Sequence, residues 1–267
     1  MIAPKLHFIQ KLYVSKFNNL KLLIMKAFSK ISILFLTVLL LSLSSCSSYS
    51  NRSKNGTTTF RNTKNLNAPK VKGKGEFITQ TLILDSISGI NLQIAANIFL
   101  SQGEEQSVRV IGQKNIIDSL TTKVKNGVWK VDLNPGIYKD IKLDIYIVLP
   151  TISFIKVSGV GDIKMGSFDG LQDLDIRLSG ASLFIAEQSS TVNGTLRISN
   201  SGTSLLDCFA IDAEICKINL SGVGKCNVTV NSKLEVNISG VGIVNYKGYP
   251  DEIKKEISGV GKLYNNN

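Results

Sequence analysis

The residue types that support enzyme chemistry are sparse in this sequence. The only histidine is His7, so no histidine follows Cys46. A Ser-His-Asp triad, a Cys-His pair and a histidine-ligated metal are therefore excluded from that part of the chain. Asp140 and Asp144 stand four residues apart in a strand-like run and are expected to share a face, but no other residue marks them as an acid and base pair. We predict a protein that is not an enzyme and holds no cofactor or metal ion.

Three cysteines in the C-terminal half invite a metal or disulfide hypothesis. Cys208, Cys216 and Cys226 follow one another at spacings of 8 and 10 residues, which match no zinc motif. Each stands at a position of a repeated pattern, described below, that is mostly held by apolar residues. We predict that they are small buried hydrophobic side chains. A zinc site or a disulfide between two of them is the alternative.

Cys46 is the cysteine whose context predicts a covalent modification. Lys26 and Lys30 precede an apolar run, residues 31–43, and the sequence LSSC then ends at Cys46. The run of 13 residues is too short to span a bilayer, which takes about 20, and the layout is typical of an export signal. LSSC resembles the lipobox of bacterial lipoproteins, which implies cleavage before Cys46 and acylation of its thiol. The alternative is a buried helix that ends in a free cysteine.

The lipobox resemblance sets the expected boundaries of the N-terminal part. Residues 1–45 are the predicted signal segment, and residues 1–24 are either a misassigned start or a long N-terminal region, because Met25 begins a better signal than the first residue does. Ser47 stands where an inner-membrane retention signal would prefer Asp, so the resemblance implies a lipid anchor in the outer membrane. The leaflet stays open, although the lack of acidic residues directly after Cys46 favours the periplasmic side.

The formal net charge of +11 comes from the N-terminal part of the chain. Residues 1–75 contain 13 of the 31 Lys and Arg residues and no acidic residue, whereas 18 basic and 20 acidic residues follow from Glu76 onward. The later part offers no basic surface to phosphate, which argues against nucleic acid as a partner. Residues 46–75 are rich in Ser, Asn, Thr, Lys and Gly and predict a flexible basic tether, either a solvated spacer or one held near anionic lipid.

A short motif repeats through the C-terminal part. SGVG starts at four serines and the variants SGAS and SGTS fill the gap, so that the six starts are 21, 22, 20, 18 and 19 residues apart. A period near 20 residues predicts stacked units. The residues five, three and one before each serine are mostly apolar and those between them mostly polar, the pattern of a strand with one buried face. The fifth residue after each serine is again apolar, which predicts a second half-buried strand.

Each repeat is predicted to be a strand, a tight Ser-Gly corner, a second strand and a looser return. We expect the corner glycine to take a positive φ angle, the small residue two further on to leave room for the next corner about 4.8 Å away, and the serine hydroxyls to hydrogen-bond along the stack. A phosphate-binding glycine loop is the alternative, but it requires a helix where another alternating strand follows. The predicted corners are Ser158 and Gly159, Ser179 and Gly180, Ser201 and Gly202, Ser221 and Gly222, Ser239 and Gly240, and Ser258 and Gly259.

The chain after the tether is therefore expected to be all-β. Residues 76–150 contain short alternating runs between Gly, Asn and Pro signals, with one helical turn at residues 115–122. Residues 151–264 are expected to form a β-solenoid with repeats of about 20 residues. A column of polar residues that alternates loosely in sign predicts ion pairs between neighbouring strands. This column contains Asp175, Arg197, Lys217, Glu235 and Lys254.

These segments resemble a known family. SVRVIG, VWKVDL, the IYIVLP strand that leads into ISFIKVSGVGDIKM, and the serial SG corners resemble the DUF2807 family, also called the putative auto-transporter adhesin head GIN domain, over residues 77–263. The resemblance implies a right-handed parallel β-helix of the pectin-lyase kind without retained catalytic residues, and a role in adhesion. SNSG replaces the usual corner at Asn200 and Ser201, so one irregular rung is expected.

Three functions follow, in order of preference. The first is a lipid-anchored β-solenoid of the cell envelope that acts in adhesion or interaction, with a protein or glycan partner. The second is a polysaccharide-processing enzyme on the same scaffold, which predicts Asp, Arg and Lys clustered in a groove. The third is a protein that binds a small ligand or a glycan, in which Trp129, Tyr138 and Tyr146 form a platform unless they pack in the core or a hairpin. A homo-oligomer is left open.

Overall fold

The structure, a computed structural model, describes residues 59–62 and 67–267. Contacts divide the chain into Met1–Tyr49 and Ser50–Asn267, and the described residues all belong to the second unit. The predicted signal segment and Cys46 lie outside the described residues, as do residues 46–58 and 63–66 of the predicted tether. The described remainder of that tether contains two strands, Thr59–Arg61 and Lys70–Lys72, which pair with Ile137–Lys139, so the prediction of a flexible segment up to residue 75 was wrong. No helix in the described part of the chain is long and apolar enough to cross a membrane.

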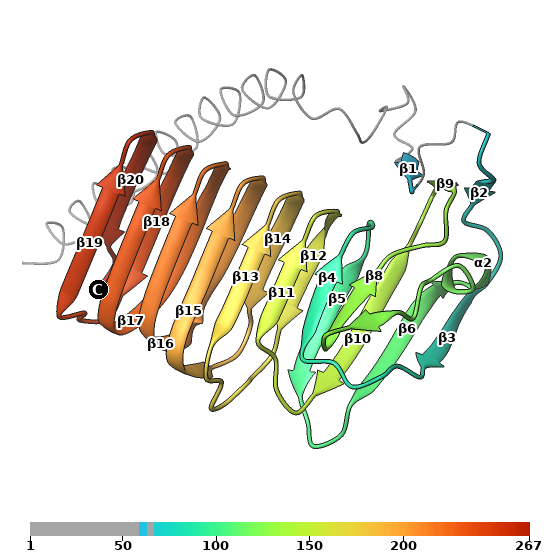
Figure 1. Cartoon of the computed structure of the whole chain (residues 1–267), viewed down its shortest axis with the longest axis horizontal. Coiled ribbons are helices and arrows are strands. Elements are labelled where there is room, and N and C mark those ends of the chain that lie inside the picture. Colours follow the sequence, from blue (N-terminus) through green and yellow to red (C-terminus); the bar gives the residue numbers. More distant parts are fainter. Residues whose placement is uncertain (1–58, 63–66) are drawn as a thin grey trace, which may run out of the picture. The chain divides into compact units, whose positions relative to one another are not determined.

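The fold is almost entirely β-structure, as the alternating patterns predict (Figure 1). The short helix α2 (Lys114–Ile117) overlaps the helical turn expected at residues 115–122. The strands of the N-terminal part are β1 (Thr59–Arg61), β2 (Lys70–Lys72), β3 (Phe77–Leu82), β4 (Gly89–Leu92), β5 (Asn97–Gln102), β6 (Ser107–Gln113), β7 (Val124–Lys125), β8 (Val128–Val131), β9 (Ile137–Lys139) and β10 (Leu143–Leu149). The strands of the repeats are β11 (Phe154–Val157), β12 (Val160–Met165), β13 (Leu174–Leu178), β14 (Ala181–Ala186), β15 (Ser190–Asn200), β16 (Thr203–Leu220), β17 (Val223–Ile238), β18 (Val241–Lys247), β19 (Glu252–Ile257) and β20 (Val260–Asn265).

The N-terminal part combines antiparallel and parallel pairing. β9 joins β1 and β2 in a separate three-stranded sheet, antiparallel to β1 and parallel to β2. β6 pairs antiparallel with both β3 and β10. β10 also pairs in parallel with β5, and β5 pairs in parallel with β12. The N-terminal part and the repeats therefore belong to one continuous sheet.

The repeats stack in two rows of parallel strands that are joined at the Ser-Gly corners (Figure 1). The strands that end at a corner form the pre-corner row, which runs β11, β13, β15, β16, β17, β19 and is extended at its start by β4 and β8. The strands that begin after a corner form the post-corner row, β12, β14, β16, β17, β18, β20. β16 and β17 belong to both rows, and their register shifts where they pass from one row to the other.

The interior of the stack is built from the apolar positions of the repeat. The third residue before the corner serine is Ile155, Ile176, Ile198, Ile218 and Val236 in the first five rungs, and none of these side chains is more than 3% exposed. The fifth residue after the serine is fully buried in the same rungs. Burial of one such side chain stabilises the fold by about 1.5–3 kcal/mol. This alternation confirms the predicted β-solenoid.

The corner glycines are required for a reason other than the expected one. None of the six has a positive φ angle, so that expectation was wrong. Instead, the backbone of each corner touches the corner before it. A Cβ atom on Gly180 would lie 1.8 Å from the Gly159 carbonyl oxygen, and one on each of the four later corner glycines would lie 2.1 or 2.2 Å from the preceding glycine's oxygen. Only a residue without a side chain fits at this distance.

The other two expectations for the corners hold at some rungs and not at all of them. A Cβ atom on Gly224, two residues after a corner glycine, would lie 2.3 Å from the Ser204 carbonyl oxygen of the preceding rung. The Ser179 hydroxyl donates a hydrogen bond to the Val157 carbonyl oxygen at 3.3 Å, and the Ser221 hydroxyl bonds the previous rung in the same way at 3.4 Å. Two of the six corner serines therefore bond along the stack, and they bond to backbone oxygens and not to one another.

Asn200 replaces the apolar residue that precedes the other corners, yet the corner itself stays in register. Asn200 aligns with Leu178 on one side and Leu220 on the other, and the irregularity of this rung lies earlier in β15, where the register shifts between Val192 and Thr195. The side chain is 1% exposed. Its Oδ1 accepts a hydrogen bond from the Gly202 N–H at 3.0 Å, and its Nδ2 donates to the Val223 carbonyl oxygen at 3.4 Å. The buried amide is thus satisfied by the corner backbone.

Candidate interaction face

The outward side chains of the pre-corner row form a polar surface, which we call the ladder face. It has two columns, four and two residues before each corner serine. The first column is Phe154, Asp175, Arg197, Lys217, Glu235 and Lys254. The second column is Lys156, Arg177, Ser199, Asn219, Asn237 and Glu256. Because the strands are in register, the side chains of a column repeat about every 4.8 Å.

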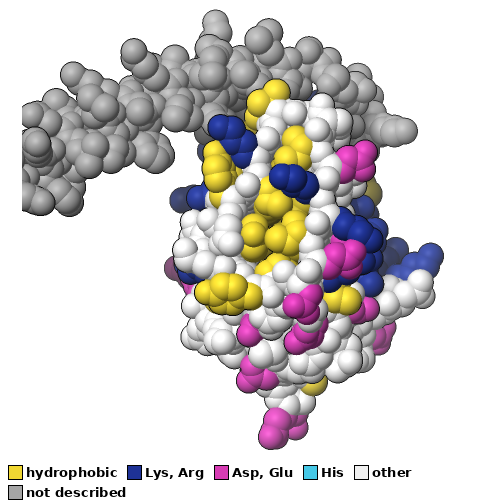
Figure 2. Space-filling model, turned by 90° about the vertical axis from the view of Figure 1, so that its left-hand side faces the viewer, with side chains coloured by type: hydrophobic (Ala, Val, Ile, Leu, Met, Phe, Trp, Pro, Cys, Tyr) yellow, Lys and Arg dark blue, Asp and Glu magenta, His cyan; other side chains and the backbone are white. Residues whose placement is uncertain are grey.

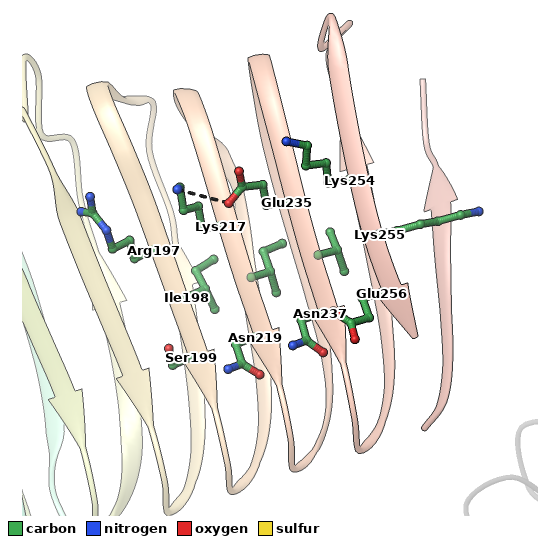
Figure 3. Close-up of a pocket in the computed structure, with 12 residues that line it drawn as sticks. Arg197, Ile198, Ser199, Lys217, Asn219, Glu235, Asn237, Lys254, Lys255 and Glu256 are labelled. Carbon is green, nitrogen blue, oxygen red and sulfur yellow. Dashed lines mark ion pairs between the residues drawn. The ribbon is translucent and has the colours of Figure 1, made fainter. Parts of the chain in front are cut away.

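An open groove of about 560 Å³ crosses the ladder face over β15, β16, β17 and β19. Figure 3 shows the first column, from Arg197 to Lys254, along one side of this groove and the second column, from Ser199 to Glu256, along the other. A smaller groove of about 230 Å³ continues toward the earlier rungs and is lined by second-column residues and corner serines. The ladder face therefore offers a continuous polar track that follows the stack.

The ion pairs of the ladder face differ from the predicted column. Lys217 Nζ lies 3.2 Å from Glu235 Oε2, which is the expected pair between neighbouring strands. Asp175, however, binds Arg177 of its own strand at 2.6 Å, and Arg197 binds a carboxylate outside the column at 3.3 Å. Long side chains reach a neighbour along the strand as easily as one across it. The predicted alternation of ion pairs along the column was therefore wrong at these positions.

Glu235, which lines the groove, and Glu252 belong to one ion-pair network. Lys233 Nζ lies 2.8 Å from Glu235 and 3.2 Å from Glu252, and Lys254 lies 2.9 Å from Glu252. Hydrogen bonds from Lys233 and Lys217 lower the pKa of Glu235, and those from Lys254 and Lys233 lower the pKa of Glu252. A general acid needs the opposite shift, because it must hold its proton near neutral pH. These two carboxylates are built to stay ionised.

Asp140 and Asp144 do not share a face as the sequence suggested. Asp140 lies in the turn after β9, at a φ angle of 55°, and pairs with Lys72 at 3.5 Å. Asp144 lies on β10 and accepts a hydrogen bond from the Asn97 amide at 2.8 Å. The turn at Asp140 interrupts the run that the sequence presents as one strand. The two carboxylates consequently have separate partners and form no acid and base pair.

The three aromatic residues considered for sugar binding are packed or stacked. Trp129 is fully buried and donates its indole N–H to a backbone oxygen at 2.9 Å, and Tyr138 is 2% exposed. Tyr146 is half-buried, with the Phe99 ring 4.6 Å away on one side and the Arg109 guanidinium 4.4 Å away on the other. Their rings are therefore not collected into a platform, and the packing alternative is correct.

The three cysteines are buried as predicted. Cys208, Cys216 and Cys226 are fully buried and free, so neither the disulfide nor the zinc alternative is found in this part of the chain. Among the described residues, no group of three or more His, Cys, Asp or Glu side chains is placed to hold a metal. Burial raises the pKa of all three thiols, that of Cys226 to about 12. A thiol that keeps its proton is a poor nucleophile and a poor metal ligand.

The uncharged part of the second column was not predicted as a site. Ser199, Asn219 and Asn237 occupy the same repeat position on three successive rungs, and their side chains make no hydrogen bond within the described part of the chain. On the post-corner row, by contrast, Asn245 donates to Asn227 at 2.7 Å. The recurrence of Ser and Asn two residues before the corner was the signal that could have found this site.

Comparison with known proteins places the chain in a family. Residues 86–250 match DUF2807, the putative auto-transporter adhesin, head GIN domain. The chain belongs to the DUF2807 family. The match runs from the segment before β4 through β18 and therefore includes most of the ladder face. This confirms the family that the SG corners and the IYIVLP junction indicated.

Three solved structures illustrate the range of proteins to which this DUF2807 chain is similar. A putative adhesin from Bacteroides fragilis is 19% identical, with 73% of this chain and 99% of that one covered and a TM-score of 0.49. A putative lipid binding protein from Parabacteroides distasonis is 17% identical, with coverages of 74% and 100% and a TM-score of 0.49. A putative adhesin from the same organism is 18% identical, with coverages of 73% and 99% and a TM-score of 0.43. No curated protein matches the chain.

Proposed function

We propose that this protein is a non-catalytic interaction module of the cell envelope that acts in adhesion through its ladder face. Membership of an adhesin-like family supports the proposal. The observation that carries it is the set of free side chains at Ser199, Asn219 and Asn237, which repeats from rung to rung beside charged residues. An extended partner, a protein segment or a glycan chain, meets the same donors and acceptors at every rung and gains a hydrogen bond at each.

Acylation of Cys46 attaches the module to the outer membrane in this proposal. The sequence LSSC and the export-signal layout before it support the attachment. Residues 46–58 then act as a tether that leads to β1, with a random-coil span on the order of 20 Å. Such a tether leaves the ladder face free to reach a partner near the membrane surface.

Protease shaving of intact cells tests the location of the module. The described domain is detected by blotting before and after treatment, and the intact mass of the purified chain reports acylation of Cys46. Cys46→Ser is the control, because it removes the thiol and should leave the chain unacylated and unanchored. Loss of the domain from whole cells is the expected result. Full protection until lysis would contradict adhesion to an external surface, and an unmodified Cys46 would contradict the anchor.

Polysaccharide binding is the second candidate function, because the free Ser and Asn side chains suit hydroxyl-rich ligands. The double variant Lys217→Ala and Asn219→Ala removes two groups from the ladder face, and Lys225→Ala removes one charge from the post-corner row. Calorimetry with soluble neutral and uronic-acid polysaccharides should show about a tenfold loss of affinity in the double variant, since each hydrogen bond contributes about 0.5–1.5 kcal/mol. Equal affinity in both variants would exclude the ladder face as the binding surface.

A further inference from the structure

The last rung of the stack has an unpaired side. β19 pairs with β17 and β20 pairs with β18, and neither pairs with a further strand within the described part of the chain (Figure 1). The backbone N–H and C=O groups on the outer side of both strands are therefore available to another strand. An open edge of this kind is a template for association with another chain.

The side chains at this end are unusually apolar for a free surface. Ile253 and Ile257 are 42% and 38% exposed, whereas the matching residues of the preceding rung, Leu234 and Ile238, are fully buried. Val260 and Tyr264 of β20 add further apolar surface and are 74% and 44% exposed. Figure 2 shows hydrophobic side chains gathered at this end of the stack with a lysine or arginine side chain among them. The end therefore combines an open strand edge with the exposed apolar surface that promotes pairing.

Lys255 is the charged residue among the inward positions of β19. It stands in register with Val236, in the column that holds an isoleucine or valine in each of the five preceding rungs. Its side chain is exposed and makes no ion pair within the described residues. In Figure 3 it points away from Lys254 and Glu256, which face the groove. The lysine ammonium group is hydrated while this end of the stack is open. A further rung would bury it, and an unpaired charge inside the core is costly.

The sequence of β19 indicates which neighbouring strand Lys255 would prevent from pairing with it. In an antiparallel pair, residues directly opposite each other lie on the same face. If β19 meets β19 of a second copy about residue 255, Ile253 faces Ile257 on the inner side and Lys254 faces Glu256 on the outer side. Both contacts are favourable. The remaining inner contact sets Lys255 against Lys255, and this one is strongly unfavourable.

We infer that Lys255 keeps the last rung from pairing with a second copy of this chain. The strand is otherwise complementary to itself, so this single inward charge decides between a free end and an end-to-end dimer. An inward-pointing charge on an edge strand is one of the known physical means of preventing edge-to-edge association. The inference is independent of the partner that the ladder face binds.

Sedimentation of the full-length chain in detergent tests the inference. Wild type is expected to remain monomeric, and Lys255→Val is expected to double in mass at concentrations where wild type does not. Lys254→Val removes the same charge from the outer side of the same strand and should remain monomeric. Ile253→Lys, added to Lys255→Val, returns a charge to the inner side and should restore the monomer.

Hydrogen exchange identifies the surface that pairs. Amides of β19 should exchange at least tenfold more slowly in the Lys255→Val dimer than in wild type, while those of β6 and β10 should not change. Three results would overturn the inference: a monomeric Lys255→Val variant, a wild-type dimer with protected β19 amides, or a Lys255→Val dimer whose β19 amides are not protected.

Discussion

The repeats and the N-terminal part bury similar apolar side chains but position them by different means. In the repeats, each later corner glycine touches the backbone of the corner before it, and the strand pairs between rungs are parallel and shift in register only at the returns between the two rows. In the N-terminal part, antiparallel and parallel pairs alternate, and individual residues with positive φ angles, Asn126 and Asp140, form the turns. The repeats therefore need one small residue at every rung, and the same contact that requires it keeps the outward columns of the ladder face in line.

Replacement of a glycine by alanine should give the largest difference in stability loss between the two regions. At Gly222 the new Cβ atom meets a carbonyl oxygen at 2.1 Å, whereas at Gly103 in the N-terminal part it meets a methyl group of Val148 at 2.5 Å. Backbone cannot move without shifting the stack, but a half-buried valine can rotate. We expect Gly222→Ala to lower the free energy of unfolding by more than about 3 kcal/mol and Gly103→Ala by about 1 kcal/mol. Urea unfolding measures both, and equal losses would refute the contrast.

A cavity should accelerate amide exchange over a shorter distance in the repeats than in the N-terminal part. Leu234→Ala in the repeats and Leu100→Ala in the N-terminal part each remove a buried side chain and should cost about 2–5 kcal/mol. Each rung of a solenoid contacts only its neighbours, so Leu234→Ala should accelerate amide exchange in β16, β17 and β19 and leave β6 and β10 unchanged. Leu100→Ala should accelerate exchange across β5, β6, β10 and β12 together. Global acceleration by Leu234→Ala would show that the stack unfolds as one unit.

The sequence predicted the repeats better than it predicted the contacts they make. Alternation identified the buried columns because burial depends on a period that is visible in one strand. The role of the corner glycines was misassigned because a glycine serves either a positive φ angle or a close approach, and the sequence does not distinguish the two. Asp175 pairs with Arg177 of its own strand instead of with a cation of the neighbouring strand. The sequence places both cations equally near and does not indicate which of them forms the ion pair. The split pairing of β6 depends on contacts between distant segments, which no local pattern encodes.

Replacement of Asn200 should raise the stability of the stack, whereas the glycine and leucine substitutions above should lower it. Its neighbours in the column are Leu178 and Leu220, and four of the other five corners donate the glycine N–H to a backbone oxygen of the preceding rung. Asn200→Leu should allow Gly202 to adopt that bond and should bury more apolar surface, raising the free energy of unfolding by about 0.5–2 kcal/mol. Thermal and urea unfolding check the sign. A loss of stability would show that the amide contributes more to this corner than an apolar side chain could.

Acid should slightly lower the stability that the ion pairs of Glu235 and Glu252 give to the stack, because the pKa values of both carboxyl groups are lowered in the folded protein. Glu235 and Glu252 have pKa values below the ordinary 4.5 because Lys217, Lys233 and Lys254 surround them, so their stabilising contribution is complete above that value and is lost as the pH falls through the lower, folded-state pKa. The groups are exposed, and the effect should be the smallest of the four. The urea midpoint of wild type should exceed that of Glu235→Gln at pH 7, and the two midpoints should converge in acid. Added salt should reduce the difference between the two midpoints at pH 7, because exposed charges are screened. A gap that persists in acid would mean that Glu235 stabilises the stack through packing and not through its charge.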